Sequence, residues 1–141
     1  MRVLVDTSVW SAALRRSRDP EPAEASELRH LIQEHRVEII GPIRQELLSG
    51  LREKAQFKKL EKHLAPFPDI PLKTEDYVAA AKLFNLLRAG GVQGSNTDFL
   101  ICAVAIRKSL AIYTNDRDFV LFSRHLPIVL HQAREFRRRD T

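Results

Sequence analysis

The sequence predicts an α/β fold built around a mainly parallel β-sheet. Short apolar runs, most of them rich in β-branched residues, alternate along the chain with longer stretches whose apolar residues recur at helical spacing. That alternation is typical of parallel sheets with helical crossovers. The chain has 141 residues, of which 44% are hydrophobic and 29% charged, and this suits one soluble domain with its own core. We therefore expect residues 1–141 to form a single domain, with a basic tail over residues 132–141.

The predicted strands are short apolar runs at residues 2–6, 37–40, 111–114 and 128–130. Between them, Thr7-Ser8 is a suitable cap for a first helix, and Pro42 suits the first position of a helix that ends before Gly50. The other predicted helices cover residues 23–34, 52–64, 74–89, 97–108 and 116–122. Proline-bearing or glycine-rich segments at residues 15–22, 65–71 and 90–95 are expected to be loops.

The composition narrows the classes of function. Lys and Arg total 23 against 18 Asp and Glu, so the net charge of +5 favours a polyanionic partner. A single cysteine, Cys102, excludes an internal disulfide framework and favours a cytoplasmic location. The longest apolar run, residues 99–106, is far shorter than the roughly 20 residues of a membrane-spanning helix. We therefore expect no membrane association, and because Asp6 interrupts any signal-peptide core, we also expect no export.

Four acidic residues stand where a parallel sheet gathers its functional groups. Asp6 ends the first predicted strand, and Asp116 follows the third strand closely. Glu46 lies about one helical turn beyond the second strand. Asp98 begins a helix that is otherwise apolar almost all round, where a charge is costly. Because the carboxyl ends of parallel strands meet at one edge, we expect these four side chains to converge there.

Clustered carboxylates repel one another and so raise one another's pKa. A divalent cation bound between them offsets this repulsion. Hard oxygen ligands suit Mg²⁺ or Mn²⁺, which can activate a water and stabilise the leaving oxygen of a phosphodiester. The pattern therefore predicts metal-dependent phosphodiester hydrolysis by a metal-activated water. Each acid also has an ordinary interpretation as a turn, cap or surface residue, so the prediction depends on the four together.

Four motifs in series carry a resemblance to a known family. They are Val5-Asp6-Thr7-Ser8, Pro42-Ile43-Arg44-Gln45-Glu46-Leu47-Leu48-Ser49-Gly50, Asn96-Thr97-Asp98-Phe99-Leu100-Ile101-Cys102-Ala103 and Thr114-Asn115-Asp116-Arg117-Asp118-Phe119. Together they resemble the PIN-domain ribonucleases, and within them the VapC toxins of bacterial type II toxin–antitoxin pairs. The resemblance covers the whole chain. Cys102 stands where alanine is common, and we interpret it as a core residue rather than a nucleophile.

The resemblance implies a PIN-like three-layer sandwich of four or five strands flanked by helices. It implies a homodimer that cleaves RNA, often tRNA, under Mg²⁺ or Mn²⁺, and a VapB-like antitoxin whose C-terminal segment lies in the active-site groove. The acids Asp6, Glu46, Asp98 and Asp116 would be the catalytic, metal-binding residues. The auxiliary residues would be Asp118, Thr7, Ser8 and Thr114.

Basic clusters are candidates for RNA contact, with a solvated charged surface as the alternative. One cluster, Arg15, Arg16 and Arg18, follows the first helix, and a second consists of Lys54, Lys58, Lys59 and Lys62. The tail arginines, residues 137–139, form a third. Two other functions stay open at this point. One is a nucleic-acid-binding regulatory module whose acids do not catalyse, and the other is a DNA nuclease with the same acidic site.

Overall fold

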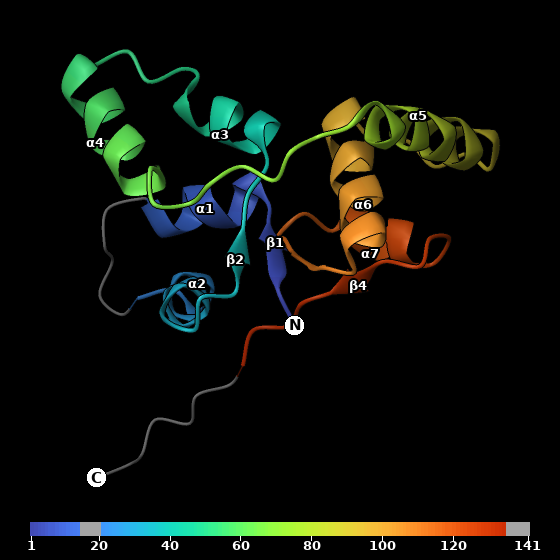
Figure 1. Cartoon of the computed structure of the whole chain (residues 1–141). Coiled ribbons are helices and arrows are strands. Elements are labelled where there is room, and N and C mark those ends of the chain that lie inside the picture. The colour runs from blue at the N-terminus through green and yellow to red at the C-terminus, as the bar shows by residue number, and fades with distance from the viewer. Residues whose placement is uncertain (15–20, 135–141) are drawn as a thin grey trace, which may run out of the picture.

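A four-stranded parallel sheet forms the centre of this computed structural model, which describes residues 1–14 and 21–134 (Figure 1). The strands are β1 (Val3–Val5), β2 (Val37–Glu38), β3 (Ala111–Tyr113) and β4 (Val129–Leu130). Their spatial order is β2-β1-β3-β4, and Val3 of β1 pairs with Val37 on one side and Ala111 on the other. The predicted α/β class with a parallel sheet is confirmed.

The strand order creates a switch in chain direction between β1 and β3. The chain leaves β1 toward β2 on one side, and it leaves β3 toward β4 on the other. Crevices that bind ligands form at such switch points, beyond the carboxyl ends of the strands. Here those ends lead into Asp6 and into the segment after Tyr113, and the Asp6 amide donates to the Tyr113 carbonyl at 2.9 Å.

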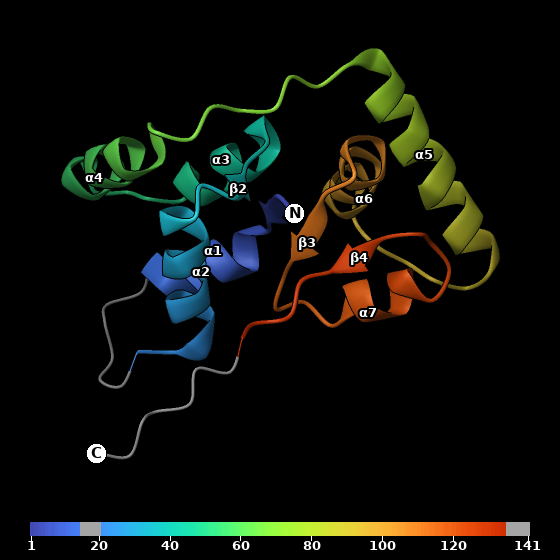
Figure 2. The same cartoon turned by 60° about the horizontal axis from the view of Figure 1, so that its bottom comes forward.

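Helices flank the sheet on two sides. In both views the first four helices gather on one side, and the last three lie on the other (Figures 1 and 2). The helices of the described residues are α1 (Thr7–Leu14), α2 (Ala23–Gln33), α3 (Gly41–Leu48), α4 (Lys54–Leu64), α5 (Thr74–Ala89), α6 (Asn96–Lys108) and α7 (Asp118–Ser123). Within this part of the chain, no helix combines the length and the apolar character needed to cross a bilayer.

The core is built around β1 and α6. All three residues of β1 are fully buried, and α6 is buried continuously from Phe99 to Ala105, as its nearly all-apolar sequence predicts. Phe99 and Phe122 pack with ring centroids 5.0 Å apart and link α6 to α7. Burial of these apolar side chains holds the N-terminus of α6 in place beside the carboxyl edge of the sheet.

The structure moves several predicted boundaries. The helix expected at residues 116–122 begins at Asp118, because the side chain of Asp116 accepts a hydrogen bond from the Asp118 amide at 2.9 Å and forms a turn first. The strand expected at residues 37–40 ends at Glu38, since Ile39 makes only an isolated bridge to Asp69 before the chain enters α3. The stretch expected to be helical from residue 52 is helical from Lys54.

Candidate active site

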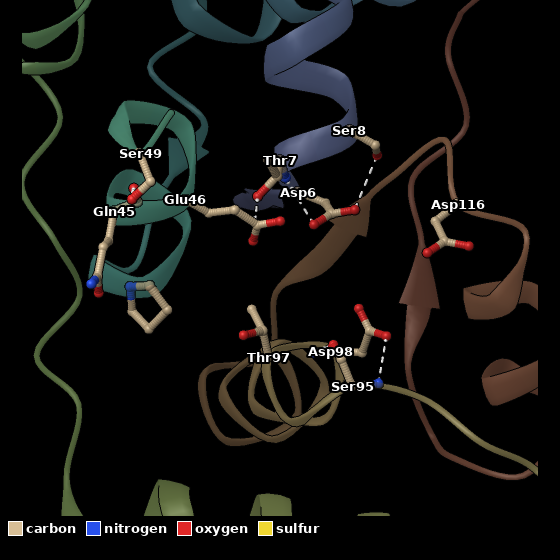
Figure 3. A pocket seen from close by; sticks show the side chains of 11 residues that line it. Asp6, Thr7, Ser8, Gln45, Glu46, Ser49, Ser95, Thr97, Asp98 and Asp116 are labelled. Carbon is tan, nitrogen blue, oxygen red and sulfur yellow. Dashed lines mark hydrogen bonds between the residues drawn. The ribbon is translucent and has the colours of Figure 1, made fainter. Parts of the chain in front are cut away.

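A single cleft of about 670 Å³ contains all four acidic residues singled out in the sequence (Figure 3). It lies beyond the carboxyl end of β1, and α3 and α6 contribute to its walls. The lining residues are Asp6, Thr7, Ser8, Pro42, Gln45, Glu46, Ser49, Ser95, Thr97, Asp98 and Asp116. We call this the acidic cleft. Four of its lining residues are acidic, and carboxylate oxygens are suitable ligands for a hard metal ion.

Asp6 is the most buried of the four acids, with 8% of its surface exposed. The structure corrects the expected cap of α1: the helix begins at Thr7, so Asp6 precedes it and its carbonyl accepts from Val9 and Trp10. The Asp6 carboxylate accepts from the Thr7 amide at 2.8 Å and from the Ser8 hydroxyl at 3.0 Å. These bonds fix the carboxylate at the N-terminus of a helix, where negative charge is stabilised.

Thr114 joins Asp6 to the loop after β3, residues 114–117, which we call the β3 loop. Its hydroxyl donates to Asp6 Oδ2 at 2.8 Å and accepts from the Asp116 amide at 3.0 Å. The Ser8 hydroxyl in turn accepts from the Asn115 amide at 3.0 Å. Two short side chains therefore hold the β3 loop against the start of α1, so that Asp116 lies across the cleft from Glu46 (Figure 3).

Asp98 is held by a capping box at the start of α6. Its carboxylate accepts from the Ser95 amide at 2.9 Å, and its own amide donates to the Ser95 hydroxyl at 3.1 Å. The pKa of Asp98 is raised above its usual value, first by burial and then by the negative charges of Asp116 and Asp6. These three carboxylates are therefore close enough to repel one another.

Glu46 completes the acidic cleft from α3. The Thr7 hydroxyl donates to Glu46 Oε2 at 3.3 Å, a long bond that leaves the exposed carboxylate free to rotate. Glu46 faces Asp98 across the opening (Figure 3). It is therefore the least fixed of the four acids.

The donor chemistry of the acidic cleft fits a hard divalent cation, because carboxylate oxygens are the ligands that Mg²⁺ and Mn²⁺ prefer. As the side chains stand, no three Asp, Glu, His or Cys residues among residues 1–14 and 21–134 come close enough to enclose an ion. Of the four acids, only Glu46 is exposed and held by one long hydrogen bond, so its side chain is the one that can turn toward Asp6 without breaking a cap or a turn. Burial and then the charges of Asp116 and Asp6 raise the pKa of Asp98, and a cation bound among these carboxylates would offset that repulsion.

Other predicted site residues have different placements. Thr7 and Ser8 line the cleft and Thr114 supports it, whereas Asp118 is exposed, does not line the cleft and contacts Asp116 through its backbone amide. The arginines Arg15, Arg16 and Arg18, and the tail residues 135–141, lie outside the described residues. The four lysines of α4 are exposed, and the structure pairs none of them with a carboxylate of the described residues.

Sequence reasoning missed several residues that line the acidic cleft. Ser95 could have been predicted as a helix cap, since a serine three positions before an acid is typical of a helix start. Gln45 and Ser49 flank Glu46 on α3, and neither has a distinctive local pattern. Thr97 belongs to the same motif as Asp98, in which only the acid was predicted to be a site residue.

Comparison with known proteins gives a consistent picture. Residues 3–124 match the PIN-domain family. The chain is 33% identical over 139 residues to a VapC ribonuclease of Mycobacterium bovis and to ribonuclease VapC11 of Mycobacterium tuberculosis, and each alignment covers 96% of this chain and 99% of the relative.

Solved structures show the same fold at lower identity. FitAcB from Neisseria gonorrhoeae superposes with a TM-score of 0.74 at 21% identity, covering 93% of this chain and 97% of that one. VapBC2 from Rickettsia felis, solved with a promoter DNA fragment, superposes with a TM-score of 0.73 at 19% identity, covering 93% and 98%.

Proposed function

The chain belongs to the PIN domain family, among the relatives of the VapC ribonucleases, and from that premise we propose that it is the toxin of a type II toxin–antitoxin pair and an endoribonuclease. The observation that carries the proposal is the gathering of Asp6, Glu46, Asp98 and Asp116 in one cleft at the switch point of the sheet. The basic composition of the chain supports a polyanionic substrate.

We propose that the four acids hold Mg²⁺ or Mn²⁺. A divalent cation held by these acids would lower the pKa of a water and neutralise the charge that develops on a phosphodiester. Asp6 supplies the most rigid carboxylate, because the Thr7 amide and two hydroxyls fix it. Asp98 and Asp116 approach from α6 and from the β3 loop. Glu46 is free to orient a ligand or a water from the side of α3.

Thr7, Ser8 and Thr114 serve as positioning residues in this proposal, since each hydroxyl bonds a carboxylate of the cleft. Asp118 serves as an auxiliary acid, and its backbone amide donates to the Asp116 carboxylate. No side chain of Ser, Thr or Cys is needed as a nucleophile. Cys102 in particular is buried, and burial raises the pKa of its thiol to about 12.

The proposed substrate is structured RNA such as tRNA, and the proposed partner is a VapB-like antitoxin, in the cytoplasm. We also propose a homodimer. The long helix α5 exposes Val78 and Leu86, which are eight positions apart and so lie on one side of the helix, where a second copy would cover them. Light scattering across a concentration series tests the dimer, and a monomer at every concentration contradicts it.

A cleavage assay tests the central proposal. Purified protein, freed of any partner, is incubated with total RNA and with single-stranded and duplex DNA in EDTA, Mg²⁺ or Mn²⁺. Asp98→Asn is assayed beside it, with Glu61→Gln as a matched control, because Glu61 is an exposed acid on α4 outside the cleft. Circular dichroism establishes that both variants fold.

We expect discrete RNA fragments that require the metal, disappear with Asp98→Asn and persist with Glu61→Gln. Calorimetric titration with Mn²⁺ gives a second readout, in which Asp98→Asn weakens binding of the metal. Cleavage of DNA alone would favour the DNA nuclease. Binding of RNA with no cleavage in any ion would favour the regulatory module, and folded Asp98→Asn with full activity would remove Asp98 from the catalytic set.

A further inference from the structure

A second cleft lies beside the acidic cleft on the same edge of the sheet. Its volume is about 320 Å³, and it is built from the ends of β3 and β4, the β3 loop, α7 and the first turn of α2. The lining residues are Ala23, Glu24, Ile112, Tyr113, Thr114, Asn115, Asp116, Arg117, Val120, Leu130, His131, Gln132 and Ala133. We call this the β4 cleft.

Asp116 lines both clefts, so the two are neighbours on either side of one residue. The acidic cleft extends from β1 toward α3, and the β4 cleft extends the other way toward α7 and the end of β4. Figure 2 shows β4 and α7 next to each other and the chain after β4 turning toward α2. A polymer whose phosphate lies over the four acids can therefore place an adjacent unit in the β4 cleft.

The walls of the β4 cleft combine apolar surface with polar side chains that bond no other described residue. Val120 is 47% exposed, and it offers apolar contact together with Leu130 and Ala133. The structure gives the side-chain amide of Gln132 and the guanidinium of Arg117 no bond to any other described residue. Such apolar walls with a few convergent polar groups are typical of a small-molecule site.

The far wall of the β4 cleft is rigid. His131 Nε2 lies 3.0 Å from Oε2 of Glu27, whose side chain is only 1% exposed. The His131 ring also packs against Tyr113, with ring centroids 5.1 Å apart. The Arg134 amide also donates to Glu27 at 2.9 Å. Glu27 thus holds the segment that carries Gln132 on both sides of this residue, which positions the wall of the cleft.

We propose that the β4 cleft holds the nucleobase next to the phosphodiester that is cut, and that Arg117 and Gln132 determine which base is accepted. This inference rests on the proposed ribonuclease function and adds a specificity site to it. The chemistry favours a base over a phosphate, because among the described residues two carboxylates, Glu24 and Asp116, line the cleft with one guanidinium. Arginine and glutamine can each bind two atoms of a base edge, and an arginine plane can also stack on an unpaired base.

The volume limits the occupant to about one nucleotide unit, since sites for small molecules begin near roughly 300 Å³. The β4 cleft therefore selects one base beside the cut and leaves the rest of the RNA to other surfaces. Selection of one unpaired base accords with how proteins recognise RNA sequence, which is mainly through unstacked bases in single-stranded segments.

The first test measures binding without catalysis. The four ribonucleoside monophosphates are titrated in EDTA into the ¹⁵N-labelled protein, and the side-chain amide resonances of Asn115 and Gln132 are followed by NMR. Inorganic phosphate is the control ligand. We expect saturable shifts with at least one nucleotide, and an affinity about tenfold lower in Arg117→Ala and in Gln132→Ala. Equal shifts with phosphate alone, or no shifts at these amides, overturn the inference.

The second test measures selection during cleavage. A pool of RNA with randomised sequence is digested and the ends are mapped for the wild type, Arg117→Ala and Gln132→Ala. The control is Arg124→Ala, because Arg124 is exposed, directly follows α7 and lies outside the β4 cleft. We expect the first two variants to relax the base preference at one position beside the cut, while Arg124→Ala keeps it. An unchanged preference in both overturns the inference, whereas no cleavage by the wild type refutes the ribonuclease and leaves the binding test to decide on the β4 cleft.

Discussion

The ring of Phe122 occupies the space that a side chain at Gly94 would need. A Cβ atom added at Gly94 would lie 2.6 Å from Cζ of Phe122 and 3.0 Å from the ring of Phe99. Both phenylalanines are buried, and Phe122 is fixed further by Phe119, whose ring centroid lies 5.2 Å away. Gly94 immediately precedes Ser95, so this contact also sets where the capping box of Asp98 begins.

Gly94→Ala is expected to destabilise the protein by about 1–3 kcal/mol, because the added methyl overpacks a rigid aromatic cluster. Gly90→Ala is the matched control from the same loop, since its added Cβ meets only the Leu87 carbonyl at 3.5 Å, an ordinary contact. Urea unfolding followed by circular dichroism measures both. Equal midpoints for Gly94→Ala and the wild type would show that the two rings move aside freely.

A buried carboxylate, Asp76, ties α5 to the end of α6. It is 1% exposed and accepts from Arg107 Nη2 at 2.8 Å and from the Lys73 amide at 2.9 Å. The hydrogen bonds from Arg107 hold the pKa of Asp76 below its usual value and outweigh the opposing effect of burial. Asp76→Asn is expected to cost about 3 kcal/mol at pH 7, because it leaves Arg107 without its charged partner.

The same pair predicts a pH dependence. Since the folded pKa of Asp76 lies below the unfolded value of 3.8, the unfolded chain binds more protons in acid. The stabilisation is therefore complete above about pH 5 and is lost as the pH falls through the folded pKa. Urea midpoints between pH 7 and pH 2 should show the gap between wild type and Asp76→Asn closing in acid. A gap of constant size across this range would refute the ionised pair as its cause.

Features of the structure that depend on neighbouring residues in the sequence can be predicted from it. The helix predicted at residues 74–89 has the same bounds in the structure, because its apolar spacing and its end at Gly90 are local features. The gathering of Asp6 and Asp116 follows from strand ends in a parallel sheet. The buried Glu27 was not predicted, since its partners His131 and Arg134 lie 104 and 107 positions away and nothing nearby marks it as buried.

Distant contacts also limit what the sequence says about the finer geometry. The β4 cleft combines residues of α2, the β3 loop and the segment after β4, so no single motif contains it. The role of Gly94 likewise depends on Phe122, which belongs to α7. Periodicity and caps predict where elements begin and end, whereas contacts between elements depend on side-chain packing that a single sequence does not reveal.

The thiol of Cys102 is expected to be unreactive in the folded protein. Burial, followed by the charges of Asp98 and Asp6, raises the pKa of its thiol to about 12, so almost no thiolate is present at pH 8. A thiol reagent at pH 8 should label the unfolded chain promptly and the native chain only as fast as it opens. Cys102→Ala should retain cleavage activity in the RNA assay, and loss of activity in that folded variant would contradict a purely packing role.

Thr114 is expected to act as a positioning residue for two acids at once, because its hydroxyl donates to Asp6 and accepts from the Asp116 amide. Thr114→Val keeps the shape of the side chain but removes both bonds, and it should lower stability by about 1 kcal/mol. Misplacing the two carboxylates should lower kcat by about ten- to a hundredfold with little change in KM. Thr114→Ser retains the hydroxyl and should restore most of kcat. If Thr114→Val and Thr114→Ser lose activity equally, the methyl group rather than the hydroxyl matters, and the hydrogen bonds to Asp6 and Asp116 do not position the site.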